Sequence, residues 1–155
     1  MVPKSHRDLP TIGWREWVAL PGLGIAAIKT KVDTGARSSA IHAFGVSVLR
    51  RGGRDIVQFQ VHPLQHNAKI VVATEAELIE YRHVRNSGGQ QMLRPVILTE
   101  LALGDRVWTI ELTLAGRDAM GFRMLLGREA LRRRFLVNPG RSYLAGRPDH
   151  DRHMR

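Results

Sequence analysis

The chain has 155 residues, of which 43% are hydrophobic, so it is long enough for one domain with a real core. It contains no cysteine, which excludes disulfides, thiolate zinc ligands and a thiol nucleophile. The formal net charge is +10, and only four of the 24 basic residues are lysines. Arginine binds carboxylates and phosphates in bidentate fashion, so we expect an acidic partner: nucleic acid, a ribosome-like surface or an acidic peptide. An arginine-rich proteome encoded by GC-rich DNA would give the same composition.

No stretch approaches the roughly 20 consecutive apolar residues that a membrane span needs. The first ten residues are polar and basic and lack the apolar core of a signal peptide. We therefore expect a cytoplasmic protein that does not engage a membrane. Residues 1–11 are expected to form a flexible N-terminal arm, residues 12–146 the folded domain, and residues 147–155 a disordered tail.

Short segments of β character follow one another between turn residues along the whole domain. Residues 75–81 fit either a helical turn or a strand, and residues 82–98 form two extended arms around a glycine-rich tip. Residues 128–134 are the one expected helix. Strands are expected at residues 14–20, 25–33, 38–43, 46–49, 56–61, 69–73, 101–103, 107–114, 124–126, 135–137 and 142–144. Many short strands with one short C-terminal helix predict an all-β protein built as a closed barrel.

The most unusual stretch is an acid at the mouth of a tight glycine turn. A mostly apolar run over residues 25–32 leads into Asp33, and Thr34, Gly35 and Ala36 follow. Asp and Gly are both poor strand residues, so a plain strand–turn–strand would not need this pair. We interpret Asp33 as a catalytic carboxylate, and Gly35 as the residue that lets backbone amides approach it.

Two segments together carry a resemblance to a known class of enzymes. Val32-Asp33-Thr34-Gly35-Ala36 and Met124-Leu125-Leu126-Gly127-Arg128 resemble the two signatures of retropepsin-like aspartic peptidases. In that family an apolar strand delivers Asp-Thr/Ser-Gly-Ala, and a later Gly-Arg starts a short helix beneath the catalytic loop. The resemblance implies two close carboxylates that share one proton, because like charges so near each other cannot both ionise.

The resemblance also implies a homodimer. This chain has a single Asp-Thr/Ser-Gly, so the second carboxylate has to come from a second copy related by a twofold axis. The hydroxyl of Thr34 would then lock the catalytic loop, including across the dimer axis.

Residues 12–18, 31–43, 94–97 and 122–128 sharpen the resemblance. Together they are similar to a bacterial family of RimB type that has long been labelled an ATP-dependent zinc protease, and the similarity extends over about residues 11–146. Members of that family occur with an ATP-grasp ligase that adds glutamates to the C-terminus of a ribosomal protein. The resemblance implies an endopeptidase that trims this poly-glutamate tail, so the partner would be an acidic peptide or the poly-glutamylated ribosomal protein, with nucleic acid involved only indirectly.

Several residues around Asp33 are candidates for substrate binding. Ala36 and Arg37 follow the Asp-Thr-Gly turn, and Lys31 precedes Asp33 on the same strand face. We interpret the glycine-rich hairpin as a flap over the substrate, with Gly88 and Gly89 at its tip and Arg85 and Arg94 on its arms. The alternative is a solvated basic hairpin and an exposed strand lysine.

The zinc and ATP label has little support in the sequence. There is no H-E-x-x-H and no G-x-x-x-x-G-K-[ST], and the nearest metal pattern, residues 62–66, has two histidines, a proline and no glutamate. We expect no cofactor and no metal. Two alternatives remain: a zinc-dependent hydrolase with scattered ligands, and a non-catalytic, basic dimeric module that binds ribosomal or nucleic-acid partners. Aromatic residues for base stacking are few.

Overall fold

The computed structural model describes residues 8–85, 88–116 and 121–148. Residues 1–7 and 149–155, which hold most of the expected arm and tail, lie outside this description. Leu9 is buried and Thr11 begins the first strand, so the packed chain starts ahead of residue 12. No helix in the described ranges is both long enough and apolar enough to cross a membrane.

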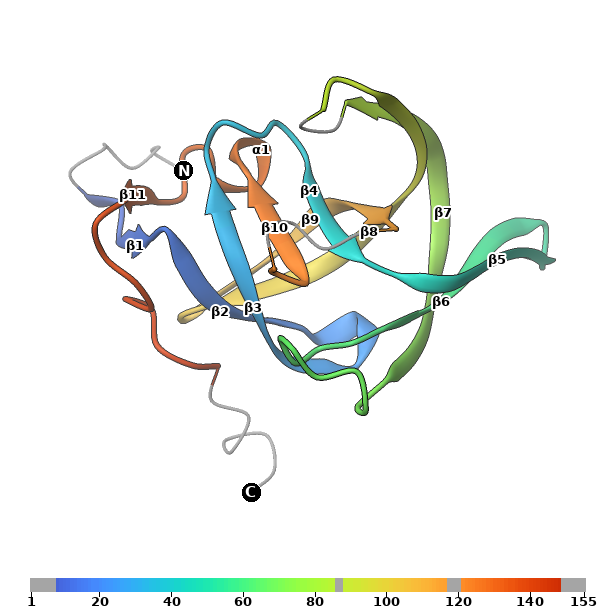
Figure 1. Ribbon diagram of the computed structural model, residues 1–155, viewed down its shortest axis with the longest axis horizontal. Helices are drawn as coiled ribbons and strands as arrows, with labels where there is room; N and C mark the ends of the chain where they lie inside the picture. Colours follow the sequence, from blue (N-terminus) through green and yellow to red (C-terminus); the bar gives the residue numbers. More distant parts are fainter. Residues whose placement is uncertain (1–7, 86–87, 117–120, 149–155) are drawn as a thin grey trace.

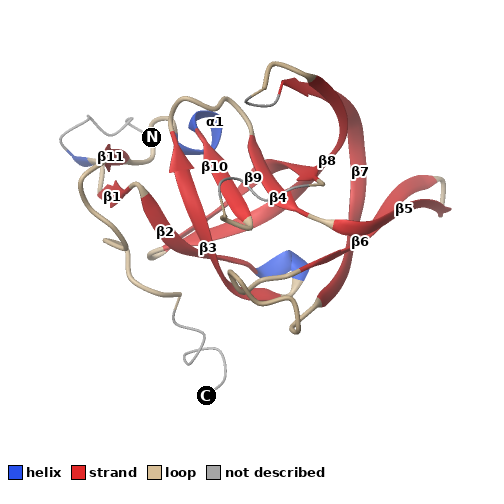
Figure 2. Ribbon diagram, in the orientation of Figure 1, coloured by secondary structure: helices blue, strands red, loops and turns tan. Residues whose placement is uncertain are grey.

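Strands form most of the regular structure of the protein (Figure 2). The helical elements of the described chain are the 3-10 turn η2 (Pro21–Leu23) and α1 (Arg128–Leu131). The strands are β1 (Thr11–Gly13), β2 (Arg15–Leu20), β3 (Ile25–Asp33), β4 (Ser39–His42), β5 (Phe44–Arg51), β6 (Arg54–Val61), β7 (Val72–Arg85), β8 (Gln91–Leu103), β9 (Arg106–Ala115), β10 (Met124–Gly127) and β11 (Leu136–Asn138).

The main sheet closes on itself (Figure 1). Its strand order is β2-β3-β10-β4-β9-β8-β7-β6-β5, and β2 pairs with β8 through Ala19 and Ala102, which completes a ring. The strands β7, β6 and β5 continue outward from that ring, and β1 and β11 form a separate parallel pair. The expected all-β class, with a closed sheet and one short C-terminal helix, is confirmed.

The core lies inside the ring because its strands alternate buried and partly exposed residues. In β2 and β3 the buried positions are spaced by two, and Val18 and Ile28 are fully buried partners in the antiparallel register. Leu112 of β9 and Leu126 of β10 are also fully buried. The apolar alternation in the sequence therefore points each of these strands at one shared core.

Two expectations for the middle of the chain need correction. The strand expected at residues 69–73 begins only at Val72 and then runs for 14 residues to Arg85. Residues 75–81, which also fitted a helix, belong to this strand: residues 75–78 alternate between exposed and half-buried positions, and residues 79–81 are all exposed. Strand pairing decides the conformation, because β6 and β8 hydrogen-bond to β7 from its two sides.

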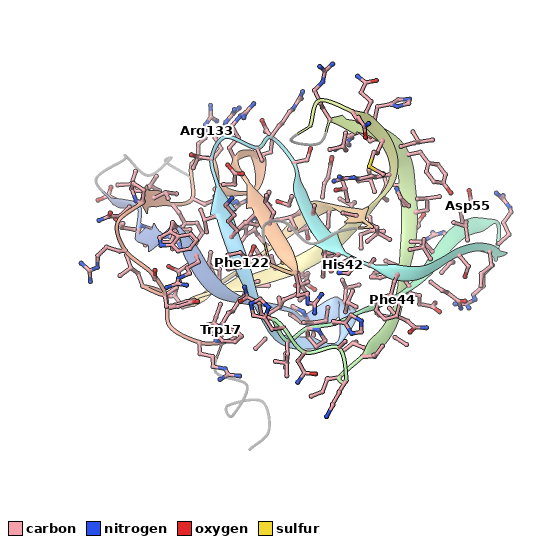
Figure 3. The ribbon with its side chains drawn as sticks, viewed as in Figure 1. Trp17, His42, Phe44, Asp55, Phe122 and Arg133 are labelled. Carbon is pink, nitrogen blue, oxygen red and sulfur yellow. The ribbon has the colours of Figure 1, made fainter. Side chains whose placement is uncertain are left out.

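The C-terminal segment also differs from expectation. The predicted helix at residues 128–134 ends at Leu131, since Arg132 is extended and Arg133 has a left-handed φ of 65°. Figure 3 labels Arg133. Residues 142–144 form no strand: Ser142 and Tyr143 are irregular, and Leu144 begins a turn. The cause is Glu16, which is fully buried and accepts hydrogen bonds from the backbone amides of Gly13, Leu144 and Ala145 at 2.7, 2.9 and 3.1 Å.

Candidate active site

Asp33 is held at the end of β3 by a parallel neighbour. Val32 pairs with Leu126 and Asp33 pairs with Gly127 in the register of β3 and β10. Val32 and Leu126 are buried, whereas Asp33 is only half-buried. The apolar strand thus fixes the backbone of Asp33 and leaves its carboxylate accessible at the edge of the core.

The turn after Asp33 folds back onto its carboxylate. The amide of Gly35 donates a hydrogen bond to Asp33 Oδ1 at 2.9 Å, and the amide of Ala36 donates to the Asp33 carbonyl at 3.2 Å. A Cβ at position 35 would lie 3.2 Å from Oδ1, so glycine permits this close approach. Thr34 is exposed, and its hydroxyl makes no hydrogen bond to any residue in the described part of the chain.

The segment Gly127–Glu129 supports this turn from below. The amides of Arg128 and Glu129 donate to the carbonyls of Ala36 and Arg37 at 2.8 and 3.2 Å. The Arg128 guanidinium adds a hydrogen bond from Nη1 to the carbonyl of Gly35 at 3.2 Å. Three successive carbonyls of the loop are therefore satisfied by three groups of one short segment, which fixes the loop that follows Asp33.

Two buried polar residues, Ser39 and Thr113, connect the segment of residues 127–129 to the sheet. Ser39 Oγ accepts a hydrogen bond from the Gly127 amide at 3.0 Å, and the Ser39 carbonyl accepts one from the Thr113 hydroxyl at 3.1 Å. Both side chains are nearly inaccessible to solvent. Sequence reasoning did not single out Ser39 or Thr113, although Ser39 lies in the stretch that follows the Asp-Thr-Gly turn.

Beside the Asp33 turn lies a groove of about 770 Å³. It is bounded by the loop after the turn, by the far end of β7, by β9 and by α1, and Figure 1 shows these elements at the same end of the molecule. The groove is lined by Ala36, Arg37, Ser38, Ser39, Arg82, His83, Val84, Arg85, Trp108, Thr109, Ile110, Glu111, Thr113, Glu129, Ala130 and Arg134.

Charges of both signs line the groove, and arginine is the commonest. Arg82 Nη2 lies 2.7 Å from Glu111 Oε2 and also pairs with Glu80. The hydrogen bonds that Arg82 donates to Glu80 and, to a smaller extent, to Glu111 raise the pKa of its guanidinium. Arg37 and Arg85 have no ion pair with another described residue. An anionic ligand in the groove would therefore meet cations that are free to bind it.

The structure brings only some of the predicted binding residues to the groove. Ala36, Arg37 and Arg85 line it. Lys31 lies on β3, in register with Arg15 and Leu125 and outside the groove. Gly88 and Gly89 are exposed in the turn between β7 and β8, and Gly89 has a φ of 83°, while Asn86 and Ser87 lie outside the described residues.

Arg94 is placed differently from the other predicted arginines. It pairs with Arg82 across β7 and β8 but does not line the groove. Its Nε is buried without a hydrogen-bond partner in the described structure, and burial lowers the pKa of its guanidinium. Sequence reasoning missed Trp108, Glu111 and Arg134, which come from distant parts of the chain and carry no local signal.

The histidines give no cluster of metal ligands in the part of the chain that the structure describes. Within residues 8–85, 88–116 and 121–148, no three His, Asp or Glu side chains come together in a way that could hold a metal ion. His62 stacks on Phe44 with ring centroids 4.5 Å apart, and its Nδ1 lies 3.3 Å from the carbonyl of Ile70. His42 lies 3.4 Å from a guanidinium nitrogen of Arg123.

A closed β-sheet that carries Asp-Thr-Gly at the end of one strand and Gly-Arg at the start of a supporting helix defines the retropepsin-like class. Within this class, residues 11–148 match the model of the RimB-like family, which is described as 'Retropepsin-like aspartic endopeptidase RimB'. The match covers most of the sequence, and the chain belongs to the RimB-like family.

Several curated relatives resemble this chain over part of their own length. Proteins named probable alpha-L-glutamate ligase are 44% identical in Shewanella pealeana, 48% in Parasynechococcus marenigrum and 49% in Desulfotalea psychrophila. These matches cover 87, 87 and 83% of this chain but only 30, 29 and 28% of the relatives. The chain therefore spans less than a third of their length.

A solved structure shares the fold. The crystal structure of a protein with unknown function from Legionella pneumophila superposes with a TM-score of 0.71 and is 26% identical in sequence. The match covers 88% of this chain and 98% of that one. A crystal structure of another protein therefore shows the same fold.

Proposed function

We propose that this protein is a homodimeric aspartic endopeptidase in which Asp33 of each copy supplies half of the catalytic pair. The observation that carries the proposal is the Asp33–Gly35 turn, whose carboxylate is accessible and whose three following carbonyls are held by Gly127–Glu129 and the Arg128 side chain. A single chain has one such turn, so a pair of carboxylates requires two copies in an isologous dimer.

In this mechanism one carboxyl of the pair is ionised and the other is protonated. The carboxylate removes a proton from a bound water as its oxygen attacks the scissile carbonyl carbon, and the carboxylic acid donates its proton to the carbonyl oxygen. The tetrahedral gem-diol then collapses: the carboxyl that took the proton from water gives it to the leaving nitrogen as the C–N bond breaks, and a gem-diol hydroxyl returns its proton to the other carboxylate, which restores the pair. Thr34 and Gly35 position the pair, and neither a metal ion nor a covalent intermediate is required.

The proposed substrate is an acidic peptide, and specifically a poly-glutamate tail of the kind a glutamate ligase would add. Two observations support this choice. Relatives that share this part of the sequence are named probable alpha-L-glutamate ligases, and arginines such as Arg37 and Arg85 line the groove beside Asp33. Lys31, Arg94 and the hairpin tip at Gly88 and Gly89 are proposed to contact the substrate outside the groove.

A cleavage assay with a poly-glutamylated peptide tests the mechanism. The isosteric Asp33→Asn is expected to abolish cleavage, whereas wild type is expected to cleave equally with and without a chelator. Equal cleavage by wild type and variant would exclude the aspartic mechanism, and loss with chelator would favour the zinc hydrolase. Binding without cleavage by wild type would favour the non-catalytic module.

Mixing wild type with the variant tests whether the pair is shared between copies. If each site takes one Asp33 from each copy, a ninefold excess of Asp33→Asn should lower the activity per wild-type chain to about a tenth after subunit exchange. Activity that is unchanged by the excess would show that each chain works alone.

A further inference from the structure

Arg82 is the groove residue with the most unusual surroundings. Its Nε donates a hydrogen bond to Glu80 Oε1 at 2.9 Å, and its Nη2 lies 2.7 Å from Glu111 Oε2. Glu80 belongs to the same strand as Arg82, but Glu111 belongs to β9, and β8 lies between the two strands. Arg82 and Glu111, which both line the groove, therefore meet over β8.

These ion pairs are accessible to solvent and easily exchanged. The side chain of Glu111 is 52% exposed, that of Glu80 is 47% exposed and that of Arg82 is 32% exposed. An exposed pair of this kind changes an equilibrium constant by at most about fivefold. A carboxylate on an incoming ligand can therefore take the place of Glu111 on Nη2 of Arg82 at small cost.

The neighbouring charges favour such an exchange. Arg94 is the direct cross-strand partner of Arg82, and its buried Nε has no hydrogen-bond partner in the described residues. Like charges directly opposite each other destabilise a sheet, so an added anion between or beside them is favourable. Arg37 and Arg85 line the same groove with no carboxylate partner among the described side chains.

We propose that Arg82 selects a carboxylate side chain of the substrate, and that Glu111 is a built-in competitor that occupies Arg82 while the groove is empty. This rests on the proposed function in one respect, namely that the groove takes an acidic peptide. Glu111 then raises the selectivity of the groove, because an anion binds Arg82 only if it displaces the Glu111 carboxylate. Anions that bind Arg82 weakly do not achieve this.

Binding can be measured apart from cleavage. A hexaglutamate peptide is titrated calorimetrically into the full-length Asp33→Asn protein at low salt, alone and with Glu111→Gln. Removing the competitor is expected to tighten binding by about two- to fivefold. Arg54 and Glu77 form a similarly exposed pair 3.4 Å apart and outside the groove, so Glu77→Gln controls for the change in net charge.

A double-mutant cycle assigns the effect to Arg82. Arg82→Gln is expected to weaken hexaglutamate binding more than Arg54→Gln does, and Glu111→Gln should no longer tighten binding when Arg82 is absent. Thermal unfolding of each variant verifies that the fold is retained.

Three results would overturn the inference. These are a Glu111→Gln affinity no higher than that of Glu77→Gln, a gain that persists without Arg82, and no binding of hexaglutamate by any variant. None of them bears on the Asp33 mechanism, which the cleavage assay decides separately.

Discussion

Replacing Gly127 by alanine should destabilise the protein through one steric clash. A Cβ at this position would stand 2.6 Å from the Ser38 carbonyl oxygen, 2.7 Å from its carbon and 2.9 Å from the Arg37 carbonyl oxygen. Carbon contacts are optimal near 3.5–4.0 Å, so the loop would have to retreat by about 1 Å. The φ of Gly127 is −89°, a value that alanine adopts freely, so the whole penalty is steric.

Overpacking of this kind costs about 1–3 kcal/mol, which corresponds to a Tm lower by about 3–10 °C for a chain of this size. The assay is thermal unfolding followed by circular dichroism. Gly116→Ala is the matched control, because a Cβ there meets nothing within 4 Å. A Gly127→Ala protein that melts as high as Gly116→Ala would refute the reasoning. Because the loop that must retreat follows Asp33, we also expect lower peptidase activity well below the Tm.

Two further predictions concern the carboxylates of Glu16 and Glu75. Glu16→Gln should cost about 1–3 kcal/mol in urea unfolding, compared with the exposed Glu100→Gln, because a carboxamide cannot accept all three buried backbone amides that Glu16 binds. The pKa of Glu75 is lowered, chiefly by the hydrogen bond from Arg51, so this pair stabilises the fold at neutral pH and is lost as the pH falls through that pKa. Arg51→Gln should raise the pKa of Glu75, as measured by NMR titration of its side-chain carboxyl carbon, and an unchanged pKa would contradict the assigned cause.

The sequence predicted the elements whose boundaries are encoded locally. The strand at residues 25–33 has the predicted bounds because an apolar alternation starts after Gly24 and stops at Asp33. The strands expected at residues 101–103 and 107–114 lie in β8 and β9, and Gly104-Asp105, a typical hairpin turn, connects them. The many short strands predicted the closed sheet. The resemblance to retropepsin-like peptidases supplied the relation between residues 33–35 and 127–128, which the parallel pairing of β3 and β10 bears out.

Interactions between distant residues account for what the sequence could not predict. Glutamate, alanine and leucine at residues 75–78 suit a helix, and only pairing with β6 and β8 makes them a strand. The turn near residue 143 depends on Glu16, which is 128 residues from Leu144. The ion pair between Arg82 and Glu111 likewise depends on the order of β7, β8 and β9 in the sheet. The spacing of the two residues in the sequence does not predict that they meet.

In the proposed dimer, losing the partner copy and losing the support of the Asp33 loop should have different effects on stability and activity. Within one chain, β10 pairs with β3, and the amides of Arg128 and Glu129 and the Arg128 guanidinium bind the loop that follows Asp33. In the proposed dimer each copy would hold its own Asp33 in this way, and the partner copy would supply the second carboxylate. Substitutions that block dimerisation should thus leave a folded chain with half a site. Substitutions at Gly127, by contrast, should lower stability and activity together, because they disturb the loop within each copy.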